Sequence, residues 1–251
     1  MTWAARRRKL IIAILIVCSA ALVAVVFIAT AYRAPSCMDN AQNQGENGID
    51  CGGPCPYLCS ADETAPRITF VRPVSPTKGR TDVIAYVSNE NADAAAHAVP
   101  YTLELYDSHL QIITKREGII SLPAAATVPL FISNAYVGKA VITQAFITFN
   151  TGSIKWQRSI AKQILPRPSN IQIDNSPTPK ISATLSNPTA TALYNETVIA
   201  TVFDVANNAI GASQTVISSL PGQGSAPVIF TWNQAFEGVP VRVEILPAPS
   251  L

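Results

Sequence analysis

The sequence predicts an all-β protein that carries an N-terminal transmembrane helix, a short disulfide-rich segment and two tandem β-sandwiches. Residues 10–32 form one long apolar run, and four cysteines follow within residues 37–59. Residues 66–251 contain many short β-branched or aromatic runs separated by Gly, Pro, Asn and Asp, a pattern typical of antiparallel strands. The expected segments are a basic cytoplasmic tail (1–9), a transmembrane helix (10–32), a cysteine-rich segment (33–65) and two sandwiches (66–165 and 166–251).

The composition favours folded domains over disorder. With 48% hydrophobic and only 14% charged residues among 251, the chain can bury cores of ordinary size. The formal net charge is +2, but five cations flank the apolar run, so the remaining residues carry a slight negative charge. We therefore expect no nucleic-acid partner.

Residues 10–32 are expected to cross the lipid bilayer. The run holds 23 uncharged residues, and a helix rising about 1.5 Å per residue would span a hydrocarbon layer of about 30 Å. Four cations at positions 6–9 precede the run, whereas only Arg33 follows it closely. This asymmetry predicts a single-pass protein of the cell membrane with a cytoplasmic N-terminus and extracytoplasmic C-terminal domains.

A cleaved signal peptide is the alternative interpretation of this run. Ala29, Thr30 and Ala31 offer the small residues of a cleavage site, but the apolar region of a signal peptide has only about 7–15 residues. The length of the run favours a retained anchor. Cys18 is expected to be an unpaired apolar residue of the helix.

The cysteines that follow the helix predict two disulfides. Their even number outside the membrane indicates oxidation, and three connectivities stay open. The segment is short and rich in Gly, Asn and Pro, so cross-links must replace a buried core. The cysteines concerned are Cys37, Cys51, Cys55 and Cys59.

Two metal sites compete with this interpretation. Four thiolates can hold zinc, but these cysteines lack the paired spacing of zinc ribbons. Calcium can be held by side-chain oxygen atoms, here those of Asp39, Asn43, Asn47 and Asp50, although these residues do not follow the EF-hand pattern. The alternative is that these side chains cap turns. We predict no metal and no cofactor, and the calcium question stays open.

Part of this segment resembles a Cys-rich DCGGxC motif that recurs in uncharacterised surface and secreted proteins of prokaryotes. The resemblance rests on Asn43, Gly45, Glu46, Gly48 and residues 50–55. It implies a location at the cell surface but no chemistry. The gap before Cys59 is one residue longer than usual, which leaves the partner of Cys59 open.

An internal duplication predicts the two sandwiches. Residues 83–89 and 181–187 are alternating strands that end in Ser-Asn, and each is followed by a strand ending in Asp, at Asp107 and Asp204. Two prolines within residues 165–170 predict a stiff linker between the copies.

Alternation along the strands also predicts the core residues. We expect inward positions for Leu103, Leu105 and Phe131 in the first copy and for Val202 and Phe230 in the second, with Phe131 aligned to Phe230.

Both copies resemble the prokaryotic sandwich family named for an FxLYD-type strand. The resemblance rests on Leu-Glu-Leu-Tyr-Asp at 103–107 and, more loosely, on Thr-Val-Phe-Asp at 201–204. It implies immunoglobulin-like β-sandwiches in envelope proteins.

No catalytic constellation is expected, so we predict that the protein is not an enzyme. His109 lies beside Asp107 and Ser108, but three neighbours at a turn cannot easily converge on one attacked atom, and turn capping is expected instead. Aromatic side chains can stack on sugars or fill cores, and the core interpretation is favoured for Trp156 and Trp232. The other aromatic candidates are Tyr86, Tyr101, Tyr136 and Tyr194.

Two functions are compatible with these features. The first is a structural or interaction protein of the cell envelope, held in the lipid bilayer by residues 10–32, whose partner is another envelope protein or assembly. The alternative is a surface module that binds a glycan or peptidoglycan of the cell wall.

Overall fold

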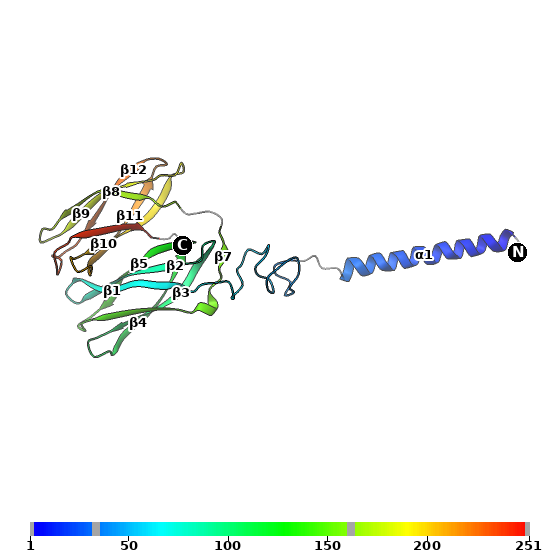
Figure 1. Cartoon of the computed structure of the whole chain (residues 1–251), viewed down its shortest axis with the longest axis horizontal. Coiled ribbons are helices and arrows are strands. Elements are labelled where there is room, and N and C mark those ends of the chain that lie inside the picture. The colour runs from blue at the N-terminus through cyan, green and yellow to red at the C-terminus, as the bar shows by residue number, and fades with distance from the viewer. Residues whose placement is uncertain (1–2, 32–35, 160–163, 249–251) are drawn as a thin grey trace. The chain divides into compact units, whose positions relative to one another are not determined.

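The predicted all-β fold class is confirmed. The computed structural model describes residues 3–31, 36–159 and 164–248, which form one helix and thirteen β-strands (Figure 1). The chain divides into two compact units, Met1–Cys55 and Pro56–Leu251, and the strands lie in the second unit.

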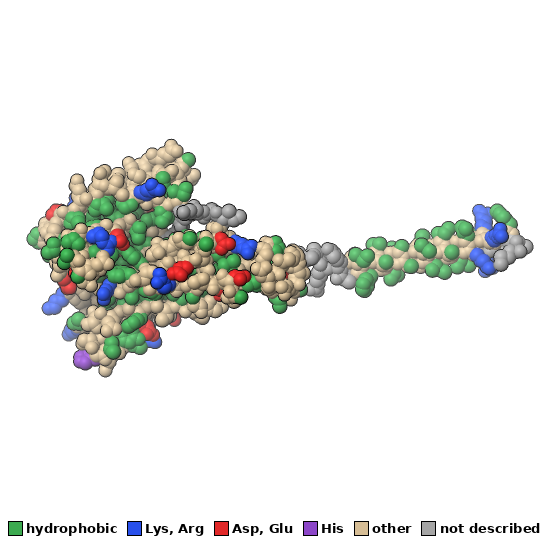
Figure 2. Space-filling model, viewed as in Figure 1, with side chains coloured by type: hydrophobic (Ala, Val, Ile, Leu, Met, Phe, Trp, Pro, Cys, Tyr) green, Lys and Arg blue, Asp and Glu red, His purple; other side chains and the backbone are tan. Residues whose placement is uncertain are grey.

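Helix α1 (Trp3–Ala31) covers residues 10–31 of the predicted membrane segment and begins seven residues before it. Within α1, the candidate span Arg6–Ala29 contains an 18-residue stretch with a mean hydropathy of 3.3, none of which is buried, so this helix is long and apolar enough to cross a membrane. Figure 2 shows hydrophobic side chains along the helix and cations near its N-terminal end. Tyr32 and Arg33 lie outside the described residues.

The first sandwich consists of two antiparallel sheets. One sheet has the order β1-β2-β5 and the other β4-β3-β6, while a short strand β7 also pairs with β3. The strands are β1 (Arg67–Thr77), β2 (Arg80–Asn89), β3 (Ala94–Tyr106), β4 (Ile112–Leu122), β5 (Ala126–Val137), β6 (Gln144–Phe149) and β7 (Gln157–Arg158). A single turn of 3₁₀-helix, η1 (Thr151–Ser153), precedes β7.

The second sandwich repeats this topology strand for strand. Its sheets have the orders β8-β9-β12 and β11-β10-β13, so β8 to β13 correspond to β1 to β6. The strands are β8 (Arg167–Asp174), β9 (Lys180–Ser186), β10 (Leu193–Phe203), β11 (Ala209–Leu220), β12 (Ser225–Thr231) and β13 (Arg242–Pro247). The internal duplication inferred from the sequence is therefore a duplication of the whole sandwich.

Each sandwich has its own apolar core. In the first, Leu103 and Leu105 of β3 are fully buried against residues of β2 and β6, as predicted. In the second, Val202 and Phe230 are likewise buried in one cluster that joins both sheets. Because side chains alternate along a strand, residues two apart reach the same core.

A buried asparagine occupies the same position in both sandwiches. The side-chain amide of Asn89 donates to the carbonyl oxygens of Ala94 and Pro123, each at 2.8 Å. The amide of Asn187 donates in the same way to the carbonyl oxygens of Thr191, at 2.8 Å, and Pro221, at 3.2 Å. Each asparagine thus joins the turn after its own strand to a turn more than 30 residues further along the chain.

The prediction for Phe131 was wrong. Its side chain is half-buried and packs against a cluster between the two sandwiches, and Ile132 faces the core of the first sandwich instead. Ile132 pairs with Val83, and Phe230 pairs with Ile181, so Ile132 is the true counterpart of Phe230. The sequence alignment of Phe131 with Phe230 was therefore displaced by one residue. Because side chains alternate along a strand, a displacement of one residue places the side chain on the other face of the sheet.

The predicted linker at 165–170 was also partly wrong, since Arg167 to Asn170 belong to β8, and Arg167, Pro168 and Ser169 pair with β9. Pro168 is tolerated there because β8 is an edge strand. An edge strand pairs on one side only, so the N–H that proline lacks is not needed for a hydrogen bond to a second neighbouring strand.

The two sandwiches are packed against each other by apolar and aromatic side chains. Val74 and Ile84 of the first sandwich share a buried cluster with Ile199 and Ala212 of the second. The ring of Phe70 lies 5.9 Å from that of Phe203, between ring centroids. Burial raises the pKa of Tyr86 in this contact.

The first prediction concerns the second core. Replacing Phe230 by Ala leaves a cavity between the sheets and is expected to lower the free energy of unfolding by about 3–5 kcal/mol. The matched control is Ile229→Ala on the same strand, because Ile229 is 48% exposed while Phe230 is 2% exposed. Urea unfolding of both variants measures the difference, and equal losses would contradict the register of β12.

The second prediction concerns the buried asparagines. Asn89→Ala and Asn187→Ala each remove a buried amide that donates to carbonyl oxygens of two turns, and each is expected to lower the free energy of unfolding by about 1–3 kcal/mol. Asn150→Ala serves as the control, since Asn150 is exposed and its side chain forms no capping hydrogen bond. Losses confined to one of the two asparagines would show that the repeated network is not equivalent in the two sandwiches.

Candidate functional site

All four cysteines of the cysteine-rich segment are oxidised. Cys37 and Cys55 form a disulfide, and Cys51 and Cys59 are disulfide-bonded as well. The sulfur atoms of Cys37 and Cys55 and a carboxylate oxygen of Glu46 all lie within 4.8 Å of one another, a spacing that suits a metal ion. The two sulfurs are bonded to each other, however, so they cannot act as thiolate ligands for zinc.

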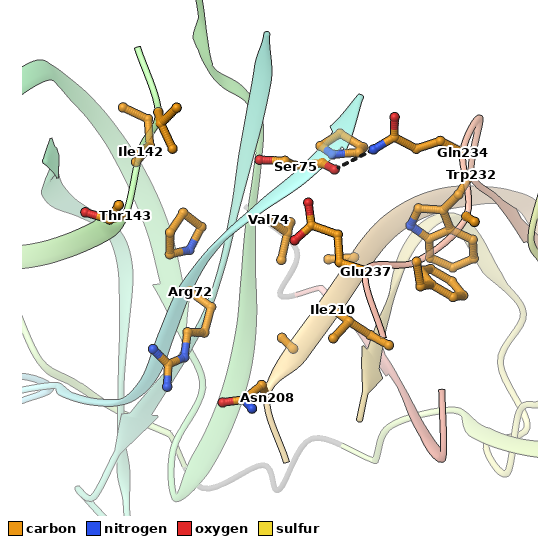
Figure 3. Close-up of a pocket in the computed structure, with 18 residues that line it drawn as sticks. Arg72, Val74, Ser75, Ile142, Thr143, Asn208, Ile210, Trp232, Gln234 and Glu237 are labelled. Carbon is orange, nitrogen blue, oxygen red and sulfur yellow. Dashed lines mark hydrogen bonds between the residues drawn. The ribbon is translucent and has the colours of Figure 1, made fainter. Parts of the chain in front are cut away.

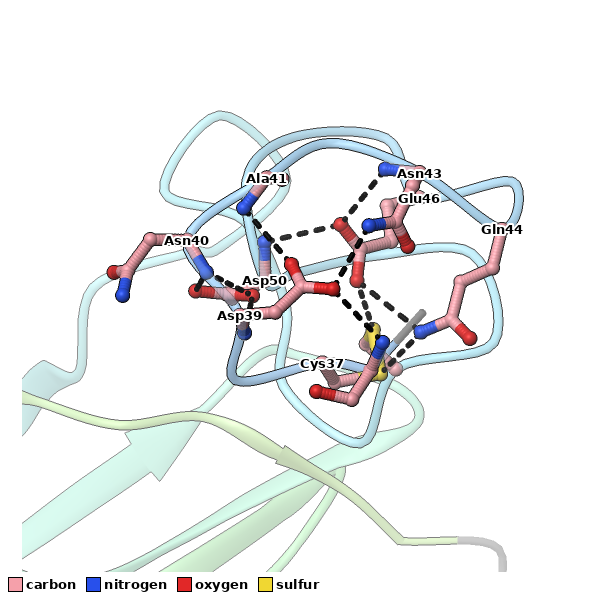
Figure 4. Close-up of a disulfide and its surroundings, with 10 residues drawn as sticks. Cys37, Asp39, Asn40, Ala41, Asn43, Gln44, Glu46 and Asp50 are labelled. Atoms are coloured by element: carbon pink, nitrogen blue, oxygen red, sulfur yellow. Dashed lines mark hydrogen bonds between the residues drawn. A yellow bond between two sulfur atoms is a disulfide. The ribbon is translucent and has the colours of Figure 1, made fainter. Parts of the chain in front are cut away.

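The carboxylates of this segment accept hydrogen bonds from the backbone (Figure 4). Asp50 accepts from the N–H groups of Asp39 and Asn40 at 3.0 Å. Asp39 accepts from the N–H of Ala41 and from the side-chain amide of Asn43, both at 2.9 Å. These contacts agree with turn capping, the alternative to the calcium interpretation.

Glu46 is the buried centre of this loop. Its side chain is 6% exposed, and one carboxylate oxygen accepts the N–H of Asp50 at 3.2 Å. Gly53 packs next to it with φ of +52°, and an added Cβ would lie 2.0 Å from the carbonyl oxygen of Gly45. The residues that carry the DCGGxC resemblance thus hold the loop together, which is a structural role.

The residue types of a hydrolase triad meet at an exposed turn. The Nδ1 atom of His109 lies 3.5 Å from the hydroxyl of Ser108 and 3.8 Å from a carboxylate oxygen of Asp107. The backbone N–H groups of Gln111 and His109 donate to Asp107 and hold the pKa of its carboxyl below the ordinary value.

Asp204 has the same geometry in the second sandwich without a histidine. It accepts from the backbone N–H of Asn208 at 2.8 Å, and this bond lowers the pKa of its carboxyl. The shared function of the two aspartates is therefore to cap the turn between two strands.

The aromatic candidates for sugar binding are divided between core and surface. Trp156 is 2% exposed and lies in the core of the first sandwich, and Trp232 is 5% exposed in that of the second. Tyr194 is 68% exposed, whereas Tyr86, Tyr101 and Tyr136 are half-buried. The described tyrosines and tryptophans therefore do not form one exposed stacking face.

An open pocket of about 450 Å³ lies where the two sandwiches meet (Figure 3). Strand β1 and the segment before β6 form one wall, and β11 and the segment after β12 form the other. A hydrogen bond of 3.1 Å from the side-chain amide of Gln234 to the carbonyl oxygen of Ser75 joins the two walls. Arg72, Asn208, Trp232, Gln234 and Glu237 are its main polar side chains.

The tryptophan of this pocket has an unsatisfied donor. Trp232 packs edge to face on Phe236, with 5.0 Å between ring centroids, and its buried Nε1 has no hydrogen-bond partner among the described residues. Gly211 allows this arrangement, because an added Cβ would lie 2.7 Å from Cε1 of Phe236 and 3.2 Å from Nε1 of Trp232.

The sequence analysis missed this pocket, although a comparison of the two copies held a signal for it. Gly211 pairs with Val202, and the corresponding pair in the first sandwich is Thr114 with Leu105. The glycine and the aromatic pair are thus features of the second sandwich that the first lacks at the corresponding strand position. Nothing in the sequence places Ser75 opposite Gln234, which are 159 residues apart.

Comparisons with known proteins do not identify the chain. No model of a protein family matches it, and no curated protein matches it either. Red sea bream transglutaminase is 14% identical over 73% of this chain and 29% of its own length, with a TM-score of 0.24. The N-terminal CBM22-1–CBM22-2 tandem domain of Xyn10C from Paenibacillus barcinonensis is 7% identical over 75% of this chain and 85% of its own, with a TM-score of 0.14. At such TM-scores neither neighbour supports an argument about function.

The third prediction concerns the glycine under the aromatic pair. Gly211→Ala is expected to displace Phe236 or Trp232 and to lower the free energy of unfolding by about 1–3 kcal/mol, as overpacking does. Gly152→Ala is the control, because the atom nearest to its added Cβ is 3.9 Å away. Urea unfolding and near-ultraviolet circular dichroism measure the effect, and an unchanged aromatic signal would contradict this packing.

Proposed function

We propose that this protein is a non-enzymatic component of the cell envelope, anchored in the membrane by α1, whose two sandwiches engage another envelope protein or assembly. In this proposal the N-terminus lies in the cytoplasm, and the disulfide-bonded segment and both sandwiches lie outside. The anchor is retained and not cleaved.

The exposed apolar surface of α1 carries the proposal. The helix is apolar around its circumference, and the most hydrophobic stretch has no buried residue within the described chain. Leaving so many Leu, Ile and Val side chains in water is unfavourable by about 25 cal/mol for each Å² of apolar surface. A bilayer covers such a helix, and Arg6, Arg7, Arg8 and Lys9 at one end favour a cytoplasmic N-terminus.

The oxidised cysteines support the same compartment. Disulfides persist outside the cytoplasm and are rare within it. The two disulfides follow α1 directly in the sequence, where an extracytoplasmic segment would begin.

The roles of the polar side chains support a function in binding. Asp107, Asp204, Asn89 and Asn187 each satisfy backbone groups of their own sandwich. Side chains engaged in this way support a rigid scaffold, and scaffolds of this kind present surfaces to partners.

Glycan or peptidoglycan binding is the second candidate function. The observation that favours it is the pocket between the sandwiches, which is lined by both polar and apolar side chains. Pockets of about 300–1,000 Å³ with a few placed polar groups are typical of small-ligand sites.

The fourth prediction tests the orientation. Protease added to spheroplasts is expected to remove the sandwiches and to leave a small membrane-bound fragment that contains α1. A cytoplasmic marker protein must stay intact as the control. Release of an intact C-terminal part by carbonate washing, with a new N-terminus near Arg33, would show instead that α1 is a cleaved signal.

A further inference from the structure

Strand β8 is an open edge of the second sandwich. Its sheet has the order β8-β9-β12, so β8 pairs with β9 on one side only (Figure 1). Seven of its eight residues are exposed, and Pro168 is half-buried. An exposed edge strand presents backbone groups to which a further strand can pair, and proteins usually cover or interrupt such edges.

The counterpart of β8 in the first sandwich is covered. Strand β1 brings Phe70 and Val74 into the contact between the sandwiches, where Val74 is only 6% exposed. None of the apolar clusters in the described part of the chain includes a residue of β8, and Ile171 and Ile173 are 39% and 38% exposed. The second copy therefore has an edge strand whose apolar side chains remain in solvent.

The pairing with β9 determines which face of the sheet each residue of β8 occupies. Pro168 and Ile173 lie opposite Leu185 and Ile181, which are fully buried, so both belong to the inner face. Residues 170–171 lie between these pairs, where β9 has a single residue, and they form a β-bulge. The residues of the outer face are Arg167, Ser169, Gln172 and Asp174.

Strand β8 is complementary to itself when two copies run antiparallel. In the register that sets Arg167 of one copy opposite Asp174 of the other, inner residues meet inner residues and outer residues meet outer ones. The two bulges then lie together at the centre, and a shift of one residue would mix the faces. The pairs in this register, each formed twice, are Arg167–Asp174, Pro168–Ile173 and Ser169–Gln172.

The charges of this register are complementary as well. Neither Arg167 nor Asp174 forms an ion pair with another described residue. Antiparallel pairing brings each arginine opposite a carboxylate, whereas a parallel pairing in register would set like charges side by side. The two charged side chains of β8 that the fold leaves without an ionic partner are therefore those that a second copy would pair.

We infer that a second copy of this chain binds at β8, so that the two sheets join through an antiparallel pair of β8 strands. A two-fold axis relates the copies, and such a contact closes on itself without forming an open filament. A strand of a different protein would not require β8 to match its own reverse, which is why a second copy is the partner that the sequence fits. The inference goes beyond the proposed function, which concerns a different envelope component, and does not depend on it.

Cysteine cross-linking of the full-length chain in detergent micelles tests the register. Every variant carries Cys18→Ser, so that the added cysteines are the free thiols, because the other native cysteines are oxidised. Ser169→Cys/Gln172→Cys is expected to give a disulfide-linked dimer on a non-reducing gel, because opposite residues have Cβ atoms about 4.5–5.5 Å apart. Either single substitution is expected to give no dimer, because like positions lie about 10 Å apart along the strands. Ser225→Cys/Ile229→Cys is the control, since both residues are exposed on β12, the other edge of the same sheet.

Charge reversal tests the two ion pairs. Arg167→Asp sets like charges opposite each other twice and is expected to weaken the dimer at least about fivefold. Adding Asp174→Arg reverses both charges and is expected to restore the dimer, and Arg116→Asp, at an exposed position on β4, is the matched control. Sedimentation equilibrium in density-matched micelles measures the association.

Several results would overturn the inference. They are the absence of a cross-link in the double-cysteine variant, equal cross-linking of the β12 control, and a double charge reversal that does not restore the dimer. A dimer that is equally stable with Arg167→Asp would show that the copies associate elsewhere, for example through α1.

Discussion

In each sandwich one buried asparagine amide joins two turns that are distant in the sequence. The side chain of Asn187 satisfies carbonyl oxygens of Thr191 and Pro221, and Asn89 does the same in the first copy. Each amide therefore holds the turn after the second strand of its copy against the turn between the fourth and fifth strands.

Duplication explains the symmetry of the molecule, and the departures from it explain the pocket. Six strands of one copy match six of the other in order and pairing. The second copy differs in having Gly211 where the first has Thr114, and in the aromatic pair that packs on this glycine. A threonine at position 211 would leave no room for the pair of Trp232 and Phe236. The glycine therefore accounts for why the second sandwich, and not the first, has this aromatic pair in the pocket wall.

The N-terminal unit is stabilised by different means. The cysteine-rich segment is too short for an apolar core, and its order comes from disulfides, from backbone N–H groups bound by Asp39, Glu46 and Asp50, and from glycines in left-handed conformations. The most apolar stretch of helix α1 has no buried residue within the described chain, and a bilayer covers its apolar surface in our proposal.

The sequence alone determined the apolar helix, the oxidised cysteines, the number of sandwiches and most of the core, because length, spacing and alternation are local properties. Leu103, Leu105, Val202 and Phe230 were assigned correctly from a period of two. Phe131 was not, because two sequence alignments that differ by one residue look equally good until strand pairing chooses between them. Only the tertiary structure decided the contact between the sandwiches and the pocket within it. Its walls come from segments 159 residues apart, and the packing that brings Ser75 to Gln234 has no counterpart in local sequence pattern.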